Sequence, residues 1–513
     1  MDSSFDYIIV GGGTAGVVIA SRLKKYLPDS RIALVEAGPN AVEHPKVNDV
    51  SDPTALIQLL QEGLVVDYST TPQDHLDNRE IMNPAGRLLS GSSGVNVGMW
   101  MRASTADHEV LAKKAGHQRF TFNNMLKYIK RLETHFDLEA DKDYCGFDGL
   151  IHTVGGRKYP LREILQKSAE KLGHRYNPDA AKGDPIGLAD FNQCFRATSA
   201  STVTRQHSAK VYDLSGVEVF CDTPVARIIF DESRRATGVE LLSGEKLYAS
   251  KEVIVCCGAQ KTPQILMLSG IGPKVDLTKH DISTIVDAPS VGQNLFDHSI
   301  LFQYYKLKEP SKGYSVPFEG TARPEYGQGL PIDFSLIANI EAANLMPHLE
   351  QDSLDTRSGD ALHMLPLSRG TITLKSADPN DGPICNPRFL STHTDRYILR
   401  RAVRENIKLV ETEPFASEIE GEAPPADPKF PILTSQSSDE DIDSRIRAFA
   451  ATVLHPMGTC ALGTVLDDEF RVNGVKGLRV CDASVFPDPI AAMPSGTIYA
   501  LAEMCAELVA GDA

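Results

Sequence analysis

A short apolar run that leads directly into a group of glycines, FDYIIVGGGTAGV near the N-terminus, constrains the fold more than any other feature of this chain. Residues 7–10 are too few for a helix, and their apolar, β-branched composition is typical of a strand buried on both faces. Gly11, Gly13 and Gly16 then give the GxGxxG spacing, and residues 17–23 have helical character. The sequence therefore predicts a strand, a tight turn and a helix.

Each glycine of this turn has a mechanical role. The first allows the tight turn, the second allows the backbone to approach a pyrophosphate, and the third allows close packing of helix and strand. The free N–H groups and the positive dipole end of the helix then face the phosphates. A dinucleotide is the expected ligand, although glycine-rich turns of this kind also occur without one.

A carboxylate follows the second expected strand. Residues 31–35 (RIALV) predict that strand, and Glu36 comes directly after it, twenty residues beyond Gly16. A carboxylate in this position can accept hydrogen bonds from a ribose 2′-OH and would repel a 2′-phosphate. The pattern therefore disfavours NADP and leaves FAD or NAD, while a solvated strand end remains the alternative for Glu36.

Length and charge set outer limits. The chain has 513 residues, which is more than one core usually holds, so we expect at least two domains. Its net charge of -16 argues against a nucleic acid or an anionic membrane as partner. It contains no apolar run of the length that a membrane span needs, and no Cys/His cluster or HExxH pattern suggests a metal.

The chain shows no pattern of a secreted protein. The first buried strand begins so close to Met1 that no signal peptide precedes it, and the nine cysteines are scattered and odd in number. Reduced thiols and a cytoplasmic location are the expectation.

A second glycine-rich stretch, residues 83–102, reads NPAGRLLSGSSGVNVGMWMR. Its small residues allow the backbone to lie against a bulky planar or anionic group. The part GRLLSGSSGVN resembles the first signature of the glucose-methanol-choline (GMC) oxidoreductase family, which lies along FAD and places an Asn beside the flavin. Ser90 departs from the usual glycine of that signature.

The second signature of the same family is matched by residues 258–272, GAQKTPQILMLSGIG, after the expected strand of residues 252–257. Residues 217–242 resemble the family segment beside the adenine, where the backbone of Val225 is the implied contact. SVGQNLFDH, residues 290–298, resembles the VGxNLxDH loop.

The resemblance implies an α/β fold, α+β overall, with a Rossmann-like FAD-binding domain and an antiparallel-sheet substrate domain. The expected boundaries assign residues 1–148, 193–298 and 441–513 to the FAD-binding domain and residues 149–192 and 299–440 to the substrate domain. Strands are expected at residues 332–338 and 370–376.

LHPMGTC, residues 454–460, resembles the HPxGT motif, which presents a His to the reactive edge of the flavin. An imidazole suits the removal of a hydroxyl proton near neutral pH while hydride leaves the alcohol carbon for flavin N5. His455 is therefore the expected general base, against the alternative that one of fourteen histidines is structural.

Met493 is the most informative departure from the family pattern. The family usually has a second active-site His or Asn there, followed by proline, and this chain has Met493 and Pro494. A thioether cannot donate a hydrogen bond to an alkoxide. Either His455 acts alone, another group substitutes, or the reaction is not ordinary alcohol oxidation.

Two further positions concern the cofactor and the substrate. Members with covalent FAD attach it through a His before the signature Asn, and this chain has Val95 there, so we expect non-covalent FAD. Trp100 is expected to line the substrate cavity with Met493, or else to be a core aromatic.

The resemblance also implies the residues that contact FAD. These are Gly11, Gly13, Thr14, Ala15, Gly16, Glu36, Arg87, Ser92, Asn96, Val97, Val225, Asp482 and Ala483. Asp482 has a helix cap as an additional or alternative role.

The sequence thus predicts an FAD-dependent oxidoreductase that oxidises a specialised, rather apolar small-molecule alcohol, for instance of secondary metabolism, and passes electrons to oxygen or another acceptor. The alternatives are a lyase or isomerase on the same scaffold, which Met493 keeps open, and a flavoprotein without catalysis. An NAD-dependent dehydrogenase is disfavoured by the two flavin-lining signatures.

Overall fold

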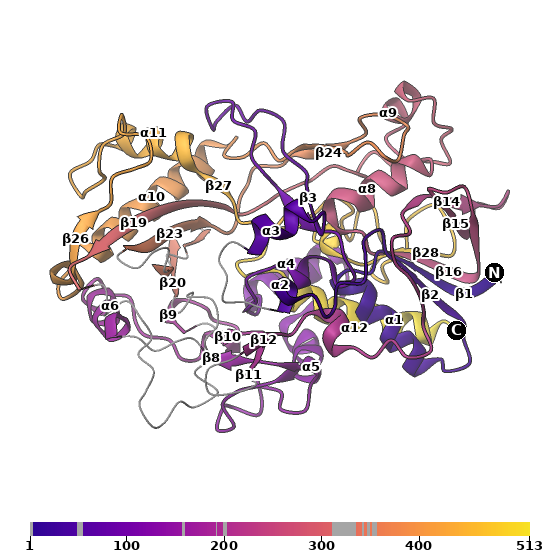
Figure 1. The fold of residues 1–513 in the computed structure, drawn as a ribbon, viewed down its shortest axis with the longest axis horizontal. Coiled ribbons are helices and arrows are strands. Elements are labelled where there is room, and N and C mark those ends of the chain that lie inside the picture. Colours follow the sequence, from indigo (N-terminus) through magenta and orange to yellow (C-terminus); the bar gives the residue numbers. More distant parts are fainter. Residues whose placement is uncertain are drawn as a thin grey trace.

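The computed structural model describes residues 4–48, 55–155, 160–190, 192–197, 203–309, 335–340, 343–345, 349–350 and 356–513. Two large sheets dominate this part of the chain and lie at opposite ends of the molecule (Figure 1). Both termini lie at the end that holds the first sheet. Among the described residues, no helix combines the length and the apolar character that crossing a bilayer requires.

The first sheet has seven strands in the order β13-β2-β1-β16-β15-β14, with β28 also paired to β16. Its strands are β1 (Ser4–Val10), β2 (Ile32–Val35), β13 (Glu218–Phe220), β14 (Val225–Phe230), β15 (Ala236–Leu241), β16 (Lys246–Val255) and β28 (Leu478–Val480). β13, β2, β1, β16 and β28 run parallel, and β14 and β15 form an antiparallel extension. This arrangement confirms the predicted α/β, Rossmann-like class.

The strand, turn and helix predicted at the N-terminus are present, and both the strand and the helix are longer than expected. β1 begins at Ser4 because it also pairs with the first half of the long strand β16, and the helix α1 covers Thr14–Tyr26. Ile8 and Ile9 are fully buried, as expected of a strand covered on both faces. α1 packs against α12 (Ser495–Gly511), the last helix of the chain.

The second sheet has eight strands in the order β26-β19-β23-β21-β20-β9, with β22 paired to β23 and β27 to β19. Its strands are β9 (Gly187–Ala189), β19 (Ser299–Leu307), β20 (Ser335–Ile340), β21 (Ala343–Leu345), β22 (Leu349–Glu350), β23 (Thr356–His363), β26 (Ile419–Glu422) and β27 (Ala451–Thr452). All of its pairings are antiparallel, as predicted. Helices α10 (His393–Val410) and α11 (Asp439–Phe449) cover one face of it (Figure 1).

The sheets follow the expected division of the chain only in outline. β27 belongs to the second sheet although it lies within residues 441–513, so the predicted domain boundaries stay a prediction. The strand expected at residues 332–338 overlaps β20, and its first three residues lie outside the described part. The strand expected at residues 370–376 is shorter, β24 (Thr371–Thr373), and pairs in a two-stranded unit with β25 (Ile384–Asn386).

The remaining described elements lie outside the two large sheets. They are α2 (Pro45–Asn48), α3 (Ala55–Gln61), β3 (Val65–Asp67), β4 (Pro84–Gly86), η1 (Gly91–Gly94), β5 (Met99–Trp100), α4 (Thr105–Ala115), η2 (Gln118–Phe120), α5 (Phe122–Leu132), β6 (Glu133–Thr134), β7 (Ile151–His152), β8 (Val154–Gly155), α6 (Pro160–Lys171), η3 (Ala180–Lys182), β10 (Asn192–Gln193), β11 (Phe195–Ala197), β12 (Val203–Arg205), α7 (Ser208–Val211), α8 (Gly258–Leu268), β17 (Ile271–Gly272), α9 (Lys274–Lys279), β18 (Val286–Asp287), η5 (Phe415–Glu418) and η6 (Ala483–Val485).

Candidate active site

The three glycines between β1 and α1 differ in what requires them. Gly11 has a φ of 99°, and a Cβ on Gly16 would lie 1.9 Å from the carbonyl oxygen of Gly11. The protein's own packing therefore requires glycine at both positions. A Cβ on Gly13 would come no closer than 3.8 Å to the nearest atom, the carbonyl oxygen of Cys256. Protein packing alone therefore does not require glycine at Gly13, and close approach of a ligand is the expected reason for it.

The N-terminus of α1 offers free donors at this point. Gly13 is its N-cap residue and supplies no side-chain hydrogen bond, so the first N–H groups, including those of Thr14 and Ala15, have no side-chain cap. Gly91, the first residue of η1, also lies close, because a Cβ on it would lie 2.8 Å from the Gly13 Cα. Uncapped donors beside two bare glycines fit a pyrophosphate.

Glu36 lies at the carboxyl end of β2 and is nearly fully buried. Its Oε2 accepts a hydrogen bond from the Gly12 N–H at 2.8 Å, and its Oε1 accepts one from the Gly38 N–H at 2.8 Å. Burial raises the pKa of this carboxyl to about 7. The carboxylate thus also orders the glycine turn, and its ribose contact stays a prediction.

The first-signature segment contains a strained residue. Ser90 has a φ of 103°, a conformation that glycine adopts more readily, and glycine is the residue that the resemblance expected there. Its Oγ lies 2.7 Å from His207 Nδ1 and accepts a hydrogen bond from the Ala209 N–H at 2.9 Å. These contacts compensate for the departure at Ser90.

Asn96 and its neighbours follow η1. The Asn96 Oδ1 accepts a hydrogen bond from the Gly98 N–H at 2.9 Å, and the Val97 side chain is 41% exposed. Arg87 and Ser92 are also exposed, and Val225 is half-buried at the start of β14. Their predicted contacts with FAD stay predictions.

Asp482 has the capping role that the sequence offered as an alternative. It is the N-cap of η6 and accepts hydrogen bonds from the Ser484 N–H at 2.7 Å, the Gly258 N–H at 2.9 Å and the Thr262 hydroxyl at 2.5 Å. It thereby ties α8, which carries the second signature, to the segment after β28, and it positions Ala483 there.

His455 is presented by a strained, tightly bonded turn. The preceding residue, Leu454, has a φ of 64°. The His455 N–H donates to Asp297 Oδ1 at 3.0 Å, and the Thr452 hydroxyl donates to Asp297 Oδ2 at 2.5 Å. Asp297 is buried, and this burial raises its pKa to about 7. Backbone strain supported by buried polar contacts is typical of functional positions.

A second histidine contacts the His455 ring. His298 Nδ1 lies 3.0 Å from His455 Nδ1, and the two rings meet edge to face. Burial lowers the pKa of His455 to about 3 and that of His298 well below its usual value, so both rings are neutral near pH 7. One Nδ1 therefore donates and the other accepts.

The surroundings of His298 favour one of these two arrangements. The backbone carbonyls of Ile490 and Met364 favour an N–H group on the His298 ring. The His298 Nε2 makes no hydrogen bond that meets the usual limits of distance and angle. If His298 carries its proton on Nε2, its Nδ1 accepts from His455 Nδ1, and the lone pair of His455 is then on Nε2. The His455 Nε2, on the side of the ring away from His298, is then free to accept a proton.

The sequence analysis missed Asp297 and His298 as site residues. It noted that residues 290–298 resemble a family loop but assigned no role to the final Asp-His pair. The pairing of that loop with the His455 turn, from Phe296 to Met457, is a long-range contact that sequence spacing does not reveal.

Met493 belongs to an apolar cluster that we call the methionine wall. Its buried members are Met99, Ile300, Leu362, Met364, Ala491 and Met493. Ile300 pairs with Leu362 across β19 and β23, and alternation places His298, which directly precedes β19, on the same face. Val453, two residues before His455, also packs on this cluster. The wall therefore adjoins the histidine pair.

Trp100 lies in the core of the first domain. Its ring centroid is 5.9 Å from that of Tyr499, and its Nε1–H donates to Glu133 Oε1 at 3.0 Å. Only 4% of the residue is exposed. These contacts correspond to the core alternative, and a role in lining a substrate cavity stays a prediction.

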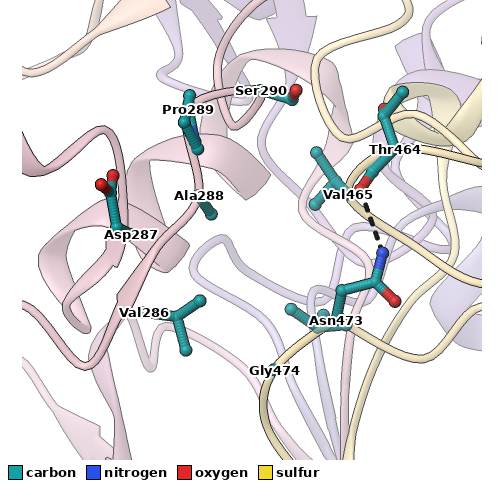
Figure 2. A pocket seen from close by; sticks show the side chains of 10 residues that line it. Val286, Asp287, Ala288, Pro289, Ser290, Thr464, Val465, Asn473 and Gly474 are labelled. Carbon is teal, nitrogen blue, oxygen red and sulfur yellow. Dashed lines mark hydrogen bonds between the residues drawn. The ribbon is translucent and has the colours of Figure 1, made fainter.

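A separate pocket of about 270 Å³ lies between the segment that follows β18 and residues 464–474 (Figure 2). Asn473 spans part of it by donating to the Thr464 carbonyl at 3.0 Å, and Asp287 is the one titratable residue in its lining. The lining includes neither His455, His298 nor Met493, so this pocket is separate from the histidine pair and the methionine wall.

Comparison with family models identifies the chain. The model of the GMC oxidoreductase N-terminal domain matches residues 5–300, and that of the C-terminal domain matches residues 366–502. Together they cover most of the chain, including the glycine turn, Asn96, the Asp297–His298 pair, His455 and Met493.

Individual relatives agree with the family match. The chain is 37% identical to the GMC-type oxidoreductase acuG of Aspergillus aculeatus, over 99% of each protein. It is 30% identical to choline oxidase of Arthrobacter globiformis, over 99% of this chain and 94% of that protein. Among solved structures, formate oxidase of Aspergillus oryzae has a TM-score of 0.87 at 25% identity, covering 99% of this chain and 98% of the other.

The bare glycines and the uncapped N–H donors at the start of α1 fit FAD, and the relatives support the same cofactor. This chain belongs to the GMC oxidoreductase family and is an FAD-dependent oxidoreductase.

Proposed function

We propose that this chain oxidises an alcohol to a carbonyl compound, with His455 as the general base. The observation that carries the proposal is the neutral pair of His455 and His298, in which the Nδ1 atoms face each other at 3.0 Å. When bound, FAD supplies the acceptor for the hydride that leaves the alcohol carbon. His455 Nε2 takes the hydroxyl proton.

Three groups of the chain keep His455 ready for this task. Asp297 accepts a hydrogen bond from the His455 N–H, and His298 contacts the His455 ring. The positive φ of Leu454 sets the direction of the turn that carries His455. A ring with a pKa lowered to about 3 is unprotonated at neutral pH and can accept the proton without first losing one. The negative charge of a developing alkoxide favours the imidazolium that then forms.

The methionine wall supports an apolar, uncharged substrate. Three of its six buried members, Ile300, Leu362 and Ala491, have sulfur-free alkyl side chains. The other three, Met99, Met364 and Met493, contribute flexible thioethers. Thioethers adapt to irregular apolar and aromatic shapes and provide no counter-ion for a cation. A specialised small molecule, for instance of secondary metabolism, fits this wall better than choline or a sugar.

The electron acceptor, oxygen or another oxidant, belongs to the same proposal, as does non-covalent binding of FAD. One relative is named an oxidase, and that name describes the relative alone. The cytoplasmic location expected from the sequence stays a prediction.

Met493 favours one second candidate, a non-oxidising lyase or isomerase on the same scaffold. Its thioether, 5% exposed within the wall, cannot stabilise an alkoxide by donating a hydrogen bond. The loss of one such donor typically raises the barrier by about 3 kcal/mol. A reaction without a full alkoxide would be less affected by that loss.

Anaerobic reduction of the flavin by a panel of alcohols tests the proposal. The purified holoenzyme is mixed with apolar primary, secondary, allylic and benzylic alcohols, and with choline as the charged comparison, while the visible flavin absorbance is followed. We expect bleaching by at least one apolar alcohol and none by choline. Bound flavin that no alcohol bleaches would contradict the proposal and favour the second candidate.

A further inference from the structure

Arg205 is a buried cation that lacks an ionic partner in the described part of the chain. The residue is 4% exposed. Its Nε–H donates to the Val47 carbonyl at 2.8 Å, and its Nη1 donates to Asn96 Oδ1 at 3.0 Å and to the Asn96 carbonyl. All of these acceptors are neutral. Burial lowers the pKa of Arg205 to about 10, so the group stays charged at neutral pH.

Other buried arginines of this protein have carboxylate partners. Arg479 is bound by Glu252 at 2.8 Å, and Arg445 is bound by Glu422 at 3.1 Å. A buried charge is strongly unfavourable unless an opposite charge compensates for it. Arg205 therefore differs from these two in a way that calls for a negative group outside the described protein residues.

The place of Arg205 identifies which part of the cofactor can provide that charge. Along the segment that it contacts, Gly91 lies against Gly13 of the phosphate turn, and Met99 belongs to the methionine wall beside the histidine pair. Asn96 lies between these two points in the sequence, closer to Met99. The guanidinium, which is bonded to Asn96, thus lies beside the stretch that joins the phosphate turn to the methionine wall.

Neighbouring groups do not change this charge. His207 is buried and neutral, since burial lowers its pKa to about 4. The Lys210 ammonium is held on the surface by Glu43 at 2.8 Å. The thiol of Cys194 and the phenol of Tyr499 are the other titratable groups that act on Arg205, and burial raises the pKa of both, so both are neutral near pH 7.

We propose that the positive charge of Arg205 acts through Asn96 to stabilise the negative charge that the isoalloxazine ring acquires on reduction. The charge balance follows from the reaction of this family. A hydride adds one proton and two electrons to a neutral oxidised ring, so the ring becomes an anion unless a further proton follows. The uncompensated guanidinium then gains its counter-charge in the reduced state.

Sulfite binding and the midpoint potential test this proposal without any substrate. Sulfite adds its electron pair to oxidised flavin and makes the ring anionic, so its affinity reports on nearby positive charge. The holoenzyme forms of wild type, Arg205→Gln and Arg445→Gln are compared. Since no alcohol is used, the result does not depend on whether this enzyme oxidises one.

We expect Arg205→Gln to weaken sulfite binding about tenfold and to lower the two-electron potential by about 30 mV, the equivalent of that factor. Arg445→Gln, which removes a buried charge from helix α11 on the second sheet, should lower thermal stability and leave both flavin properties unchanged. Unchanged sulfite affinity and potential in folded, FAD-containing Arg205→Gln would overturn the proposal.

Arg205→Lys provides a second test if the Gln variant does not fold. A buried lysine has a lowered pKa, so its charge disappears within an accessible pH range. We expect the potential of this variant to equal that of wild type at low pH and to fall below it as the pH rises. A potential that follows the wild type at every pH would overturn the proposal.

Discussion

The glycine turn and the methionine wall define the two ends of the site, and they are built in different ways. At the glycine turn, backbone atoms of Gly13 and Gly91 lie close together, and so do those of Gly11 and Gly16. At the wall, side chains of β19 and β23, together with Met99 of β5 and Met493 from the segment before α12, fill the space. Cofactor binding therefore depends on backbone conformation, and substrate choice depends on side-chain volume and polarity.

Because of this difference, we expect the two ends of the site to respond differently to substitution. A backbone cradle tolerates few substitutions, because an added Cβ meets backbone atoms that cannot move. An apolar wall tolerates exchanges of similar volume at small cost in stability. The predictions below test each end of this comparison.

The largest effect is expected for substitutions in the glycine turn. Gly16→Ala places a Cβ 1.9 Å from the Gly11 carbonyl oxygen and should destabilise the protein by about 4 kcal/mol or more. Gly13→Ala meets no protein atom within 3.7 Å and should fold normally but bind FAD weakly. Thermal unfolding of the apoproteins and the FAD content measure the two effects. Wild-type FAD affinity in Gly13→Ala would contradict the role given to this turn.

An intermediate effect is expected at the wall. Met493→Asn introduces the donor that the family pattern has there and should speed flavin reduction by simple alcohols by up to about a hundredfold. Burial of the amide should lower stability by about 1 to 3 kcal/mol. Reduction rates and thermal unfolding measure both changes.

Met99→Asn is the matched control for this change, since it puts the same amide elsewhere in the same wall. It should lower stability without increasing the rate. Equal rate gains in both variants would show that polarity of the wall, rather than the position of Met493, limits the reaction.

The smallest effect concerns the buried carboxyl behind His455. Burial raises the pKa of Asp297 to about 7, above its unfolded value of about 3.9. The folded state therefore favours the protonated form, and this contribution to stability is fully present below about pH 4 and lost as the pH rises through about 7. Asp297→Asn removes the titration but can keep the contacts with Thr452 and the His455 N–H.

The measurement is the melting temperature of wild type and Asp297→Asn across this pH range. We expect the stability of Asp297→Asn relative to wild type to increase as the pH rises, by at most about 1.4 kcal/mol for each pH unit. A constant difference between the two proteins would show that Asp297 does not titrate in this window.

The sequence predicted the cofactor end well for a physical reason. Glycine spacing, a buried strand and the carboxylate Glu36 are local, so they are visible within a few dozen residues. The observed β1, α1 and β2 agree with the expected positions to within a few residues. His455 was also predicted from local sequence, namely the residues around it, and its role as a base stays a prediction.

The parts that sequence missed depend on long-range pairing. His298 contacts His455 across 157 positions of sequence, and the compensation of strained Ser90 by His207 spans 117 positions. Sequence spacing gives no such contact. The same limit applies to Arg205, whose lack of a carboxylate partner among the described residues becomes visible only when its surroundings are assembled.

The most direct test of the central claim is the rate of anaerobic flavin reduction in His455→Ala, measured with the best alcohol found for wild type. His108→Ala, which removes another buried histidine, bonded to the Phe120 carbonyl, is the control. We predict that His455→Ala binds FAD and that the alcohol reduces this flavin about 10² to 10⁴ times more slowly than in wild type. The reduction rate of the control should equal that of wild type. Reduction at the wild-type rate in His455→Ala would contradict the assignment of His455 as the base.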